Sequence, residues 1–143
     1  MKIGFFPMVA DMLHAGHCIA IEEAKKHCDY LIIGLLCNPT HKGKRMPVQS
    51  TYERYMQLRA VKWVDEIIPY DAEVSDIELL LRSLQFDIYF LGEDYRNADF
   101  PGKEILTERG KDIFYVPRKH IISTTELIGR AYTSYSNIKE ENK

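Results

Sequence analysis

Two histidines three positions apart offer the clearest chemistry in this sequence. His14 and His17 enclose Gly16, after an apolar stretch at residues 3–6 and before a segment with helical patterning at residues 18–27. The two imidazoles therefore mark the turn from a first strand into a first helix, where they lie on one face and where free backbone N–H groups favour anions. The glycine between them lets a ligand approach the backbone. This combination predicts a phosphate-binding site.

Two other interpretations of the histidine pair are weaker. The pair could be two surface histidines at a helix start, without any ligand. It could also bind a metal ion, but Cys18, Cys28 and Cys37 form no CxxC pair, and no third ligand is evident. We therefore expect no protein-bound metal, and we interpret the cysteines as small packing residues with reduced thiols.

Composition limits the class of protein. The chain has 143 residues, the length of one domain, and a net charge of −2, which argues against a nucleic-acid partner because such proteins carry a concentrated basic face. No apolar run approaches the ~20 residues of a membrane span. Pro7 and Asp11 interrupt the short apolar stretch at the N-terminus, so no signal peptide is expected. We expect a cytoplasmic protein that does not bind a membrane.

Strands alternate with helices along the chain. Residues 30–36 form a continuous apolar run, as a parallel strand buried on both faces requires. Three of the expected helices, at Ser50, Ser75 and Ser123, open with a serine and a glutamate three residues later, the pattern of a capping box. The other expected elements are strands at 64–69, 87–91 and 113–116, helices at 50–62, 75–84 and 123–132, and a short helix that ends near Gly110.

This alternation predicts an α/β fold, a single Rossmann-like doubly wound domain with a five-stranded parallel sheet over residues 1–132. Residues 133–143 form a polar tail, and we expect residues 134–143 to fray. Ligands in such sheets bind beyond the carboxyl ends of the strands. The histidine turn, the basic loop at 38–47 and the loop at 92–102 all follow strands, so we expect them to converge on one crevice.

Four segments resemble a known family. Residues 11–17, Asp-Met-Leu-His-Ala-Gly-His, are similar to the D-x-L-H-x-G-H motif of the HxGH nucleotidyltransferases, and residues 117–125 are similar to the R-T-E-G-I-S-T-T segment of the cytidylyltransferase branch. Residues 64–69 and 91–95 resemble the V-D-E-V-I-P and G-D-D-W segments of the same family. The resemblance covers about residues 1–132 and is greatest to the branch that acts on glycerol 3-phosphate.

The resemblance implies a reaction. CMP would pass from CTP to a small phosphorylated alcohol, glycerol 3-phosphate being the first candidate, and pyrophosphate would leave. The product would be a CDP-alcohol for surface polymer or lipid synthesis; Mg²⁺ would be the cofactor, and the chain would form a homodimer. Positioning and electrostatic stabilisation supply most of the catalysis in such transfers. His14 and His17 would then donate hydrogen bonds to phosphate oxygens as charge grows on them.

The resemblance also assigns residues to the nucleotide. Arg118 would grip the triphosphate as a catalytic group, unless it is an ordinary exposed arginine. Ser123 and the two threonines after it would cradle the β- and γ-phosphates, or Ser123 would simply cap a helix. Asp11 could orient His14, help to place Mg²⁺, or hydrogen-bond its own backbone as a loop residue. Asp94 and Tyr95 lie where the family contacts the base. The implied nucleotide-binding set is Val9, Ala10, Asp11, Gly16, Gly92, Asp94, Tyr95, Arg118, Ser123, Thr124 and Thr125.

The resemblance also gives roles to two lysines of the basic loop and to two residues expected near the acceptor. Lys42 and Lys44 lie in a glycine-containing loop and could close over the phosphates as catalytic groups, or form a solvated charge run. Asn38 and Arg54 match positions that contact the acceptor in the family. Arg54 could instead form a salt bridge on the surface of its helix. Trp63 is expected in the core rather than in the site.

Three departures from the family pattern bear on the choice of base and acceptor. Residues 8–10 replace G-T-F, Asn38 stands where an aspartate is usual, and residues 119–121 replace T-E-G. An adenylyltransferase that acts on a sugar phosphate or a cofactor precursor is therefore the nearest alternative. A nucleotide-binding module without catalysis would need a catalytic residue to be absent, yet both histidines, Arg118 and Ser123 are present.

Overall fold

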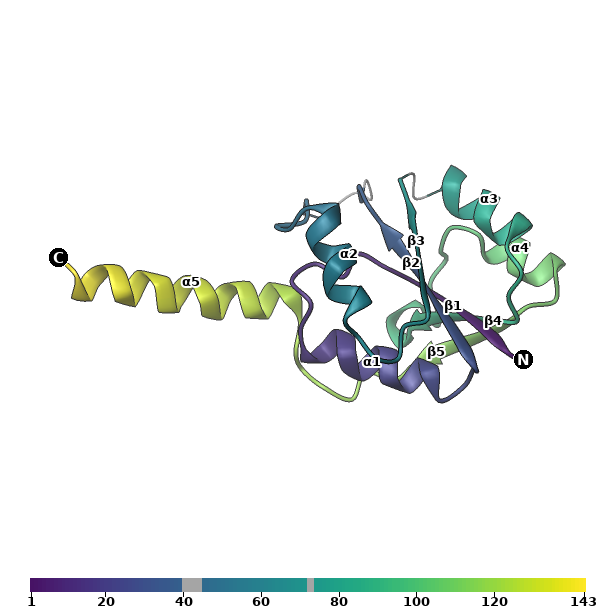
Figure 1. The fold of residues 1–143 in the computed structure, drawn as a ribbon, viewed down its shortest axis with the longest axis horizontal. Helices are drawn as coiled ribbons and strands as arrows, with labels where there is room; N and C mark the ends of the chain where they lie inside the picture. The colour runs from purple at the N-terminus through teal and green to yellow at the C-terminus, as the bar shows by residue number, and fades with distance from the viewer. Residues whose placement is uncertain (40–44, 72–73) are drawn as a thin grey trace.

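Parallel strands form one sheet in the computed structural model, which describes residues 1–39, 45–71 and 74–143 (Figure 1). The five strands of this sheet are β1 (Ile3–Met8), β2 (Tyr30–Leu36), β3 (Glu66–Tyr70), β4 (Ile88–Gly92) and β5 (Asp112–Val116). Their order is β3-β2-β1-β4-β5, and every neighbouring pair is parallel. The predicted Rossmann-like α/β fold with a five-stranded parallel sheet is confirmed.

Helices cover both faces of the sheet. Residues of α1 (Ala15–Lys25) and α2 (Thr51–Arg59) pack on one face, and residues of α3 (Ser75–Ser83) and α4 (Lys103–Glu108) pack on the other. A short 3₁₀ turn (Glu93–Tyr95) follows β4. The last helix, α5 (Thr124–Glu141), leaves the body of the domain (Figure 1).

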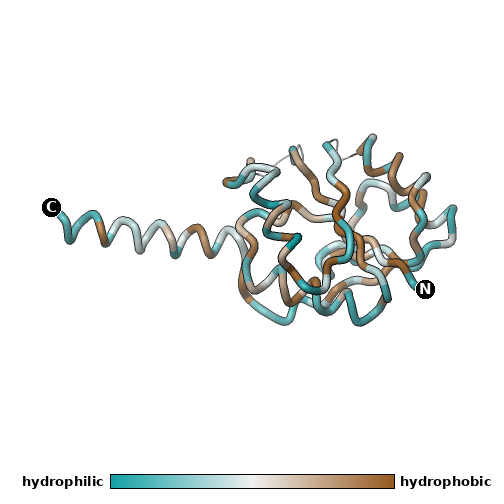
Figure 2. The backbone as a smooth tube through the Cα atoms, in the orientation of Figure 1, coloured by the Kyte–Doolittle hydropathy of each residue, from teal (hydrophilic) through white to brown (hydrophobic). Residues whose placement is uncertain are grey.

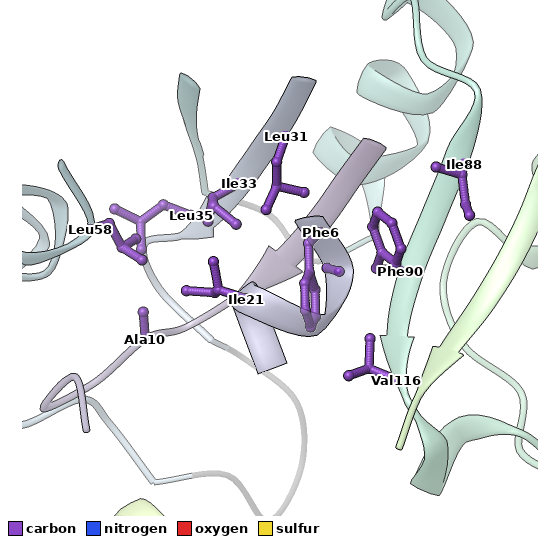
Figure 3. Close-up of a cluster of buried hydrophobic side chains, with 11 residues drawn as sticks. Phe6, Ala10, Ile21, Leu31, Ile33, Leu35, Leu58, Ile88, Phe90 and Val116 are labelled. Atoms are coloured by element: carbon purple, nitrogen blue, oxygen red, sulfur yellow. The ribbon is translucent and has the colours of Figure 1, made fainter. Parts of the chain in front are cut away.

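The strands supply a hydrophobic core on each face of the sheet. Phe6 of β1 belongs to the cluster that includes Ile21 of α1 and Leu58 of α2 (Figure 3). Its neighbour Phe5 faces the opposite way, toward α3 and α4, because successive side chains of a strand alternate between faces. Trp63 packs against the first cluster, as expected of a core residue. Figure 2 shows apolar residues along the strands and hydrophilic ones in many of the surrounding loops.

The crossover between β1 and β4 determines where a ligand can bind. From β1 the chain builds β2 and β3 toward one edge, then returns to place β4 on the other side of β1. The segments that follow β1 and β4 therefore lead to opposite faces of the sheet, and a crevice opens at the carboxyl ends of these two strands. The histidine turn follows β1 and the 3₁₀ turn follows β4, so both border this crevice.

Side-chain caps begin two of the helices as expected. Ser50 caps α2 and forms the predicted capping box with Glu53. Ser123 caps α5 by accepting a hydrogen bond from the Glu126 N–H, but the Glu126 carboxylate pairs with Arg130 instead of the Ser123 N–H, so the capping box predicted there is only half formed. The predicted capping box at Ser75 is wrong, because α3 begins at Ser75 itself and its N-cap, Val74, makes no side-chain hydrogen bond.

The segment predicted as a frayed tail, residues 134–143, instead continues α5 without a break to Glu141. None of the residues of α5 is buried, and the helix projects from the sheet and its covering helices (Figure 1). An ion pair one turn apart, Glu126 with Arg130 at 3.0 Å, supports its first half. Within residues 1–39, 45–71 and 74–143, no helix is long and apolar enough to cross a membrane.

Removal of residues 134–143 should leave the free energy of unfolding within about 0.5 kcal/mol of the full chain, because no buried residue is lost. Urea unfolding measures this. As a control, Leu58→Ala should lower the same free energy by about 2–5 kcal/mol, since that side chain is fully buried between α2 and the sheet. A drop comparable to that of Leu58→Ala after truncation would contradict the view that α5 adds nothing to the core.

Candidate active site

His14 and His17 build the first turn of α1. His14 is the N-cap, and its Nδ1 accepts a hydrogen bond of 3.0 Å from the Gly16 N–H. The Nδ1 of His17 accepts one of 3.2 Å from the His14 N–H. Two imidazoles thus take the places that a serine and a glutamate hold in an ordinary capping box. Because both Nδ1 atoms accept, the hydrogen-bond network assigns the proton of each neutral ring to Nε2.

The two Nε2 atoms have different surroundings. That of His14 lies 3.1 Å from Thr124 Oγ1, whose hydroxyl donates to the carbonyl oxygen of Asp11 at 3.3 Å. This chain of hydrogen bonds joins the histidine turn to the start of α5, 110 residues away in sequence. The Nε2 of His17 has no hydrogen-bond partner in the part of the chain that the structure describes, and His17 lines a hollow. Its N–H is therefore available to a ligand.

Both imidazoles are kept neutral by their surroundings. Burial, and then the charge of His14, lowers the pKa of His17 from 6.5 to about 4; Asp11 acts in the opposite sense and His120 in the same sense as His14. Burial likewise lowers the pKa of His14, and the charge of His120 adds to this effect. At neutral pH each ring is therefore a hydrogen-bond donor through Nε2 rather than a cation.

The hollow beside His17 has a volume of about 470 Å³. It is lined by Val9, Ala10 and Asp11, which follow β1, and by Thr124 and Thr125 from the first turn of α5. The backbone N–H groups of a first turn have no partners within the helix, and the helix dipole favours an anion there. Five predicted nucleotide-binding residues thus lie together around His17, in a setting suited to phosphate.

A second hollow of about 500 Å³ adjoins the first and shares Met8 and Val9 with it. Gly92 and Tyr95, two further predicted residues, line it at the end of β4. No atom lies within 4 Å of the place that a Cβ on Gly92 would take, so a ligand could approach the backbone there. The two hollows together form the crevice that the crossover between β1 and β4 requires.

Tyr89 is a buried phenol in the lining of the second hollow. Its side chain is 2% exposed, and its ring stacks between Phe5 and Phe100. Its hydroxyl forms no hydrogen bond within the part of the chain that the structure describes. Because no fully buried side-chain oxygen among the described residues lacks a partner, this hydroxyl reaches the surface of the hollow, where it is available to a ligand.

Asp11 holds the segment that follows the basic loop. Its carboxylate accepts hydrogen bonds from the Arg45 guanidinium at 2.7 Å, the Val48 N–H at 2.9 Å and the Gln49 N–H at 3.0 Å. Burial alone would raise the pKa of Asp11, but these donors together hold it below its usual value. Both oxygens are engaged, and neither bonds to His14 or to the turn's own backbone. Asp11 therefore links the turn after β1 to the segment that leads into α2.

Two residues of the turn after β1 have left-handed backbone conformations. Ala10 has a φ of 55° and Met12 a φ of 52°, which cost residues with side chains about 1–2 kcal/mol each. Two glutamines offset this strain. Gln49 Oε1 accepts from the Met12 N–H at 2.6 Å, and Gln57 Oε1 accepts from the Leu13 N–H at 3.3 Å. The sequence patterns had not singled out these glutamines.

Arg54 is buried and binds backbone oxygens, and this contradicts its predicted contact with the acceptor. Its side chain is 1% exposed, and its five N–H donors are all used. None is left for an acceptor phosphate. Nε donates to the Gln49 carbonyl at 3.3 Å, one terminal nitrogen donates to the carbonyls of Val9 and Leu36 at 3.0 and 2.8 Å, and the other donates to the Cys37 carbonyl at 2.8 Å and to Thr51 Oγ1 at 3.3 Å.

The other predicted residues lie at the rim. Arg118 forms an exposed ion pair of 3.7 Å with Asp94, which joins the loops after β4 and β5. Such a pair is weak in water and can exchange for a ligand. Asn38 is exposed, donates to Asp71 at 3.2 Å and lines neither hollow, so the structure gives it no contact with an acceptor site. Ser123 serves as the cap of α5.

The described residues provide no set of side chains that could bind a metal ion by themselves. Among them, no group of three or more histidine, cysteine, aspartate or glutamate side chains is placed to hold an ion. The carboxylate of Asp11, which borders the first hollow, is already hydrogen-bonded through both oxygens. Lys42 and Lys44 fall in residues 40–44, outside the described part of the chain, and their predicted role stays a prediction.

A third imidazole, which the sequence patterns did not place in the site, lies against Gly16. A Cβ on Gly16 would come within 2.6 Å of Cε1 of His120 and 2.8 Å of Cε1 of His14. Glycine is therefore required here because two rings approach its Cα. The available signal was the departure from the family signature at residues 119–121, which by itself indicated only the loss of an acidic group and a glycine.

Comparison with known proteins gives consistent matches. The model for the family described as cytidylyltransferase-like matches residues 5–133. The bifunctional protein HldE of Hyphomonas neptunium is 35% identical over 93% of this chain and 28% of its own length. The ethanolamine-phosphate cytidylyltransferase of Dictyostelium discoideum is 36% identical over 84% of this chain and 34% of its own length. The chain thus spans about a third or less of these relatives.

Solved structures show the same fold. The lipopolysaccharide core biosynthesis protein from Thermoplasma volcanium superposes with a TM-score of 0.65 at 23% identity, over 85% of this chain and 99% of that chain. Pantothenate synthetase from Thermus thermophilus gives a TM-score of 0.59 at 17% identity, over 82% of this chain and 56% of that chain. At these identities the likeness concerns the fold alone.

Arg54→Lys should lower the free energy of unfolding by about 2–4 kcal/mol, because lysine has only three donors and leaves buried carbonyl oxygens without partners. Chemical unfolding measures the change. Arg59→Lys is the matched control, since Arg59 is exposed at the end of the same helix and should change the stability by no more than about 0.5 kcal/mol. Equal effects of the two substitutions would refute the structural role.

The stability of the fold should decrease as the pH falls from 6.5 toward 4, because His17 stays neutral in the folded chain while the unfolded chain binds a proton. One such group contributes up to ~1.4 kcal/mol per pH unit. His17→Gln should reduce this slope, and it should run parallel to the wild type above pH 7, where the ring is neutral in both states. Unfolding curves at several pH values test this, and an unchanged slope would show that His17 is not held neutral.

Proposed function

Since the chain belongs to the cytidylyltransferase-like family, we propose that it transfers CMP from CTP to the phosphate of a small phosphorylated alcohol. An oxygen of the acceptor phosphate attacks the α-phosphorus, the bond from that phosphorus to the bridging oxygen breaks, and pyrophosphate leaves with the electron pair. The observation that carries this proposal is the N–H of His17, directed to a hollow that also receives the first turn of α5.

Each part of the first hollow would have a separate task. The Nε2–H of His17 would donate to an oxygen of the α-phosphate, where charge grows as the reaction proceeds. The first turn of α5, with the hydroxyls of Thr124 and Thr125, would hold the β- and γ-phosphates. His14 is also predicted to donate to a phosphate oxygen, but its Nε2 bonds to Thr124, so we assign it the role of fixing this turn relative to His17. A neutral imidazole suits the first task because it donates a hydrogen bond without losing its proton.

Mg²⁺ would enter with the nucleotide rather than reside in the protein. The carboxylate beside the first hollow is already occupied by hydrogen bonds, whereas phosphate oxygens and waters are ligands that Mg²⁺ prefers. We therefore treat the magnesium complex of CTP as the substrate. The homodimer and the cytoplasmic location expected from the sequence stay predictions.

We assign the second hollow to the acceptor, which departs from the prediction that Gly92 and Tyr95 in its lining bind the nucleotide. This hollow shares Met8 and Val9 with the first, so an acceptor bound there would bring its phosphate to the α-phosphorus. The Tyr89 hydroxyl could hydrogen-bond an alcohol, as glycerol 3-phosphate carries, or accept from an ammonium. Phosphoethanolamine is the second candidate, because Asp99 is the one charged residue in the described lining and it is an anion.

CTP should be used with a kcat/KM at least about tenfold above that of ATP, because a site that hydrogen-bonds one base leaves polar groups without partners when it holds the other. The measurement is pyrophosphate release with each nucleotide and with glycerol 3-phosphate, phosphoethanolamine or a sugar 1-phosphate. Faster turnover with ATP would replace the cytidylyl assignment by an adenylyl one. Binding of CTP without any turnover would favour a nucleotide-binding module.

The variant His17→Ala tests, in the same assay, whether the activity depends on this site. It should lower kcat by about 10² or more, the effect of removing one donor to a developing anion, while CTP still binds. His27→Ala is the matched control, because His27 packs on Phe114 outside both hollows. Turnover of His17→Ala close to that of the control would remove His17 from the reaction.

A further inference from the structure

We propose that His120 is a nucleotide-binding residue particular to this chain, whose Nε2–H donates a hydrogen bond to the sugar and α-phosphate part of the bound nucleotide. The proposal rests on the proposed function and adds a contact to it. It concerns a position at which the family signature has an acidic residue, so the contact does not follow from the resemblance.

The three imidazoles around Gly16 are oriented by the same device. In each ring Nδ1 accepts a hydrogen bond from a backbone N–H, that of Gly16 for His14, that of His14 for His17, and that of Ile122 for His120 at 3.1 Å. An accepting Nδ1 places the proton of a neutral ring on Nε2. The Nε2 of His14 is used by Thr124, whereas the Nε2 of His120 has no partner among the described residues. His120 therefore presents a fixed donor without an acceptor.

The place of His120 indicates which part of the nucleotide it would meet. Along the chain it lies between Arg118, which pairs with Asp94 at the rim, and Thr124, which lines the hollow assigned to the phosphates. With the phosphates in that hollow, the base of the nucleotide would extend toward this ion pair. The ring of His120 also covers Gly16. A nucleotide that spans the hollow and the ion pair would pass this segment with its ribose and α-phosphate.

The neighbouring side chain does not compete for this role. Lys119, next to His120 in the chain, points to the side of α1, where its Nζ lies 4.0 Å from the Glu23 carboxylate. His120 instead faces the histidine turn, where its ring lies against Gly16. Lys119 thus contacts the outer surface of α1, whereas His120 lies beside the histidine turn, next to the first hollow although outside its lining.

Two amide substitutions separate a donor role from a structural one. His120→Gln places an amide N–H near the position of Nε2 but cannot reproduce the Nδ1 acceptor. His120→Asn keeps an acceptor for the Ile122 N–H but has no donor at the position of Nε2. Titrations with CTP, 2′-deoxy-CTP and pyrophosphate would measure the affinity of both variants, with His27→Asn as the control outside the site.

His120→Asn should bind CTP about tenfold more weakly than wild type, a change typical of one lost hydrogen bond to a charged group, while its affinity for pyrophosphate stays unchanged. His120→Gln should retain most of the affinity for CTP. A smaller loss with 2′-deoxy-CTP than with CTP in His120→Asn would assign the contact to the 2′-hydroxyl, and an equal loss would assign it to the α-phosphate.

Wild-type affinity for CTP in His120→Asn, or a loss confined to His120→Gln, would overturn the proposal and leave His120 as a support for its own loop. Either result would leave the proposed function intact if the wild-type chain turns over CTP. Failure of the wild-type chain to bind any nucleoside triphosphate would instead reject the proposed function, and the His120 contact with it.

Discussion

The buried guanidinium of Arg54 fixes the geometry on which both hollows depend. A charge is costly to bury unless hydrogen bonds replace its water, and here five oxygens do so. Two of them are the carbonyls of Val9, just after β1, and Leu36, at the end of β2. One side chain of α2 therefore sets the separation of two strand ends and the position of the helix beside them. The crevice at the carboxyl edge is built around this cation.

The turn after β1 is shaped in advance of any ligand. Ala10 and Met12 adopt conformations that are unfavourable for residues with side chains, and Asp11 between them holds the segment at Val48. Backbone strain of this kind persists only where the surrounding structure enforces it, and it concentrates at functional sites. Since hydrogen bonds from α2 and its leading segment secure the turn, the first hollow has its shape without a contribution from phosphate.

Features that depend on residues close in sequence could be predicted. Features that depend on contacts between distant segments could not. The strand runs, the histidine turn and the capping box at Ser50 depend on neighbouring residues, so the sequence revealed them. The burial of Arg54 depends on oxygens from three separate segments, and an arginine at a helix start gives no sign of this. His120 approaches Gly16 only because the chain returns there a hundred residues later. Residues 134–143 bury no side chain, and their large apolar side chains, Tyr135 and Ile138, are exposed, yet they extend a helix that is capped at Ser123.

The exposed helix α5 creates a thermodynamic link between the site and its far end, about 27 Å away at 1.5 Å per residue over 18 residues. A helix of this length without packing is only marginally ordered in water, and an anion at its first turn stabilises it by about 0.3–1 kcal/mol. Occupancy of the hollow thereby increases the helicity of the whole segment. Linkage is reciprocal: any molecule that captures the outer turns of α5 in helical form raises the affinity of the distant site for phosphate by the same factor.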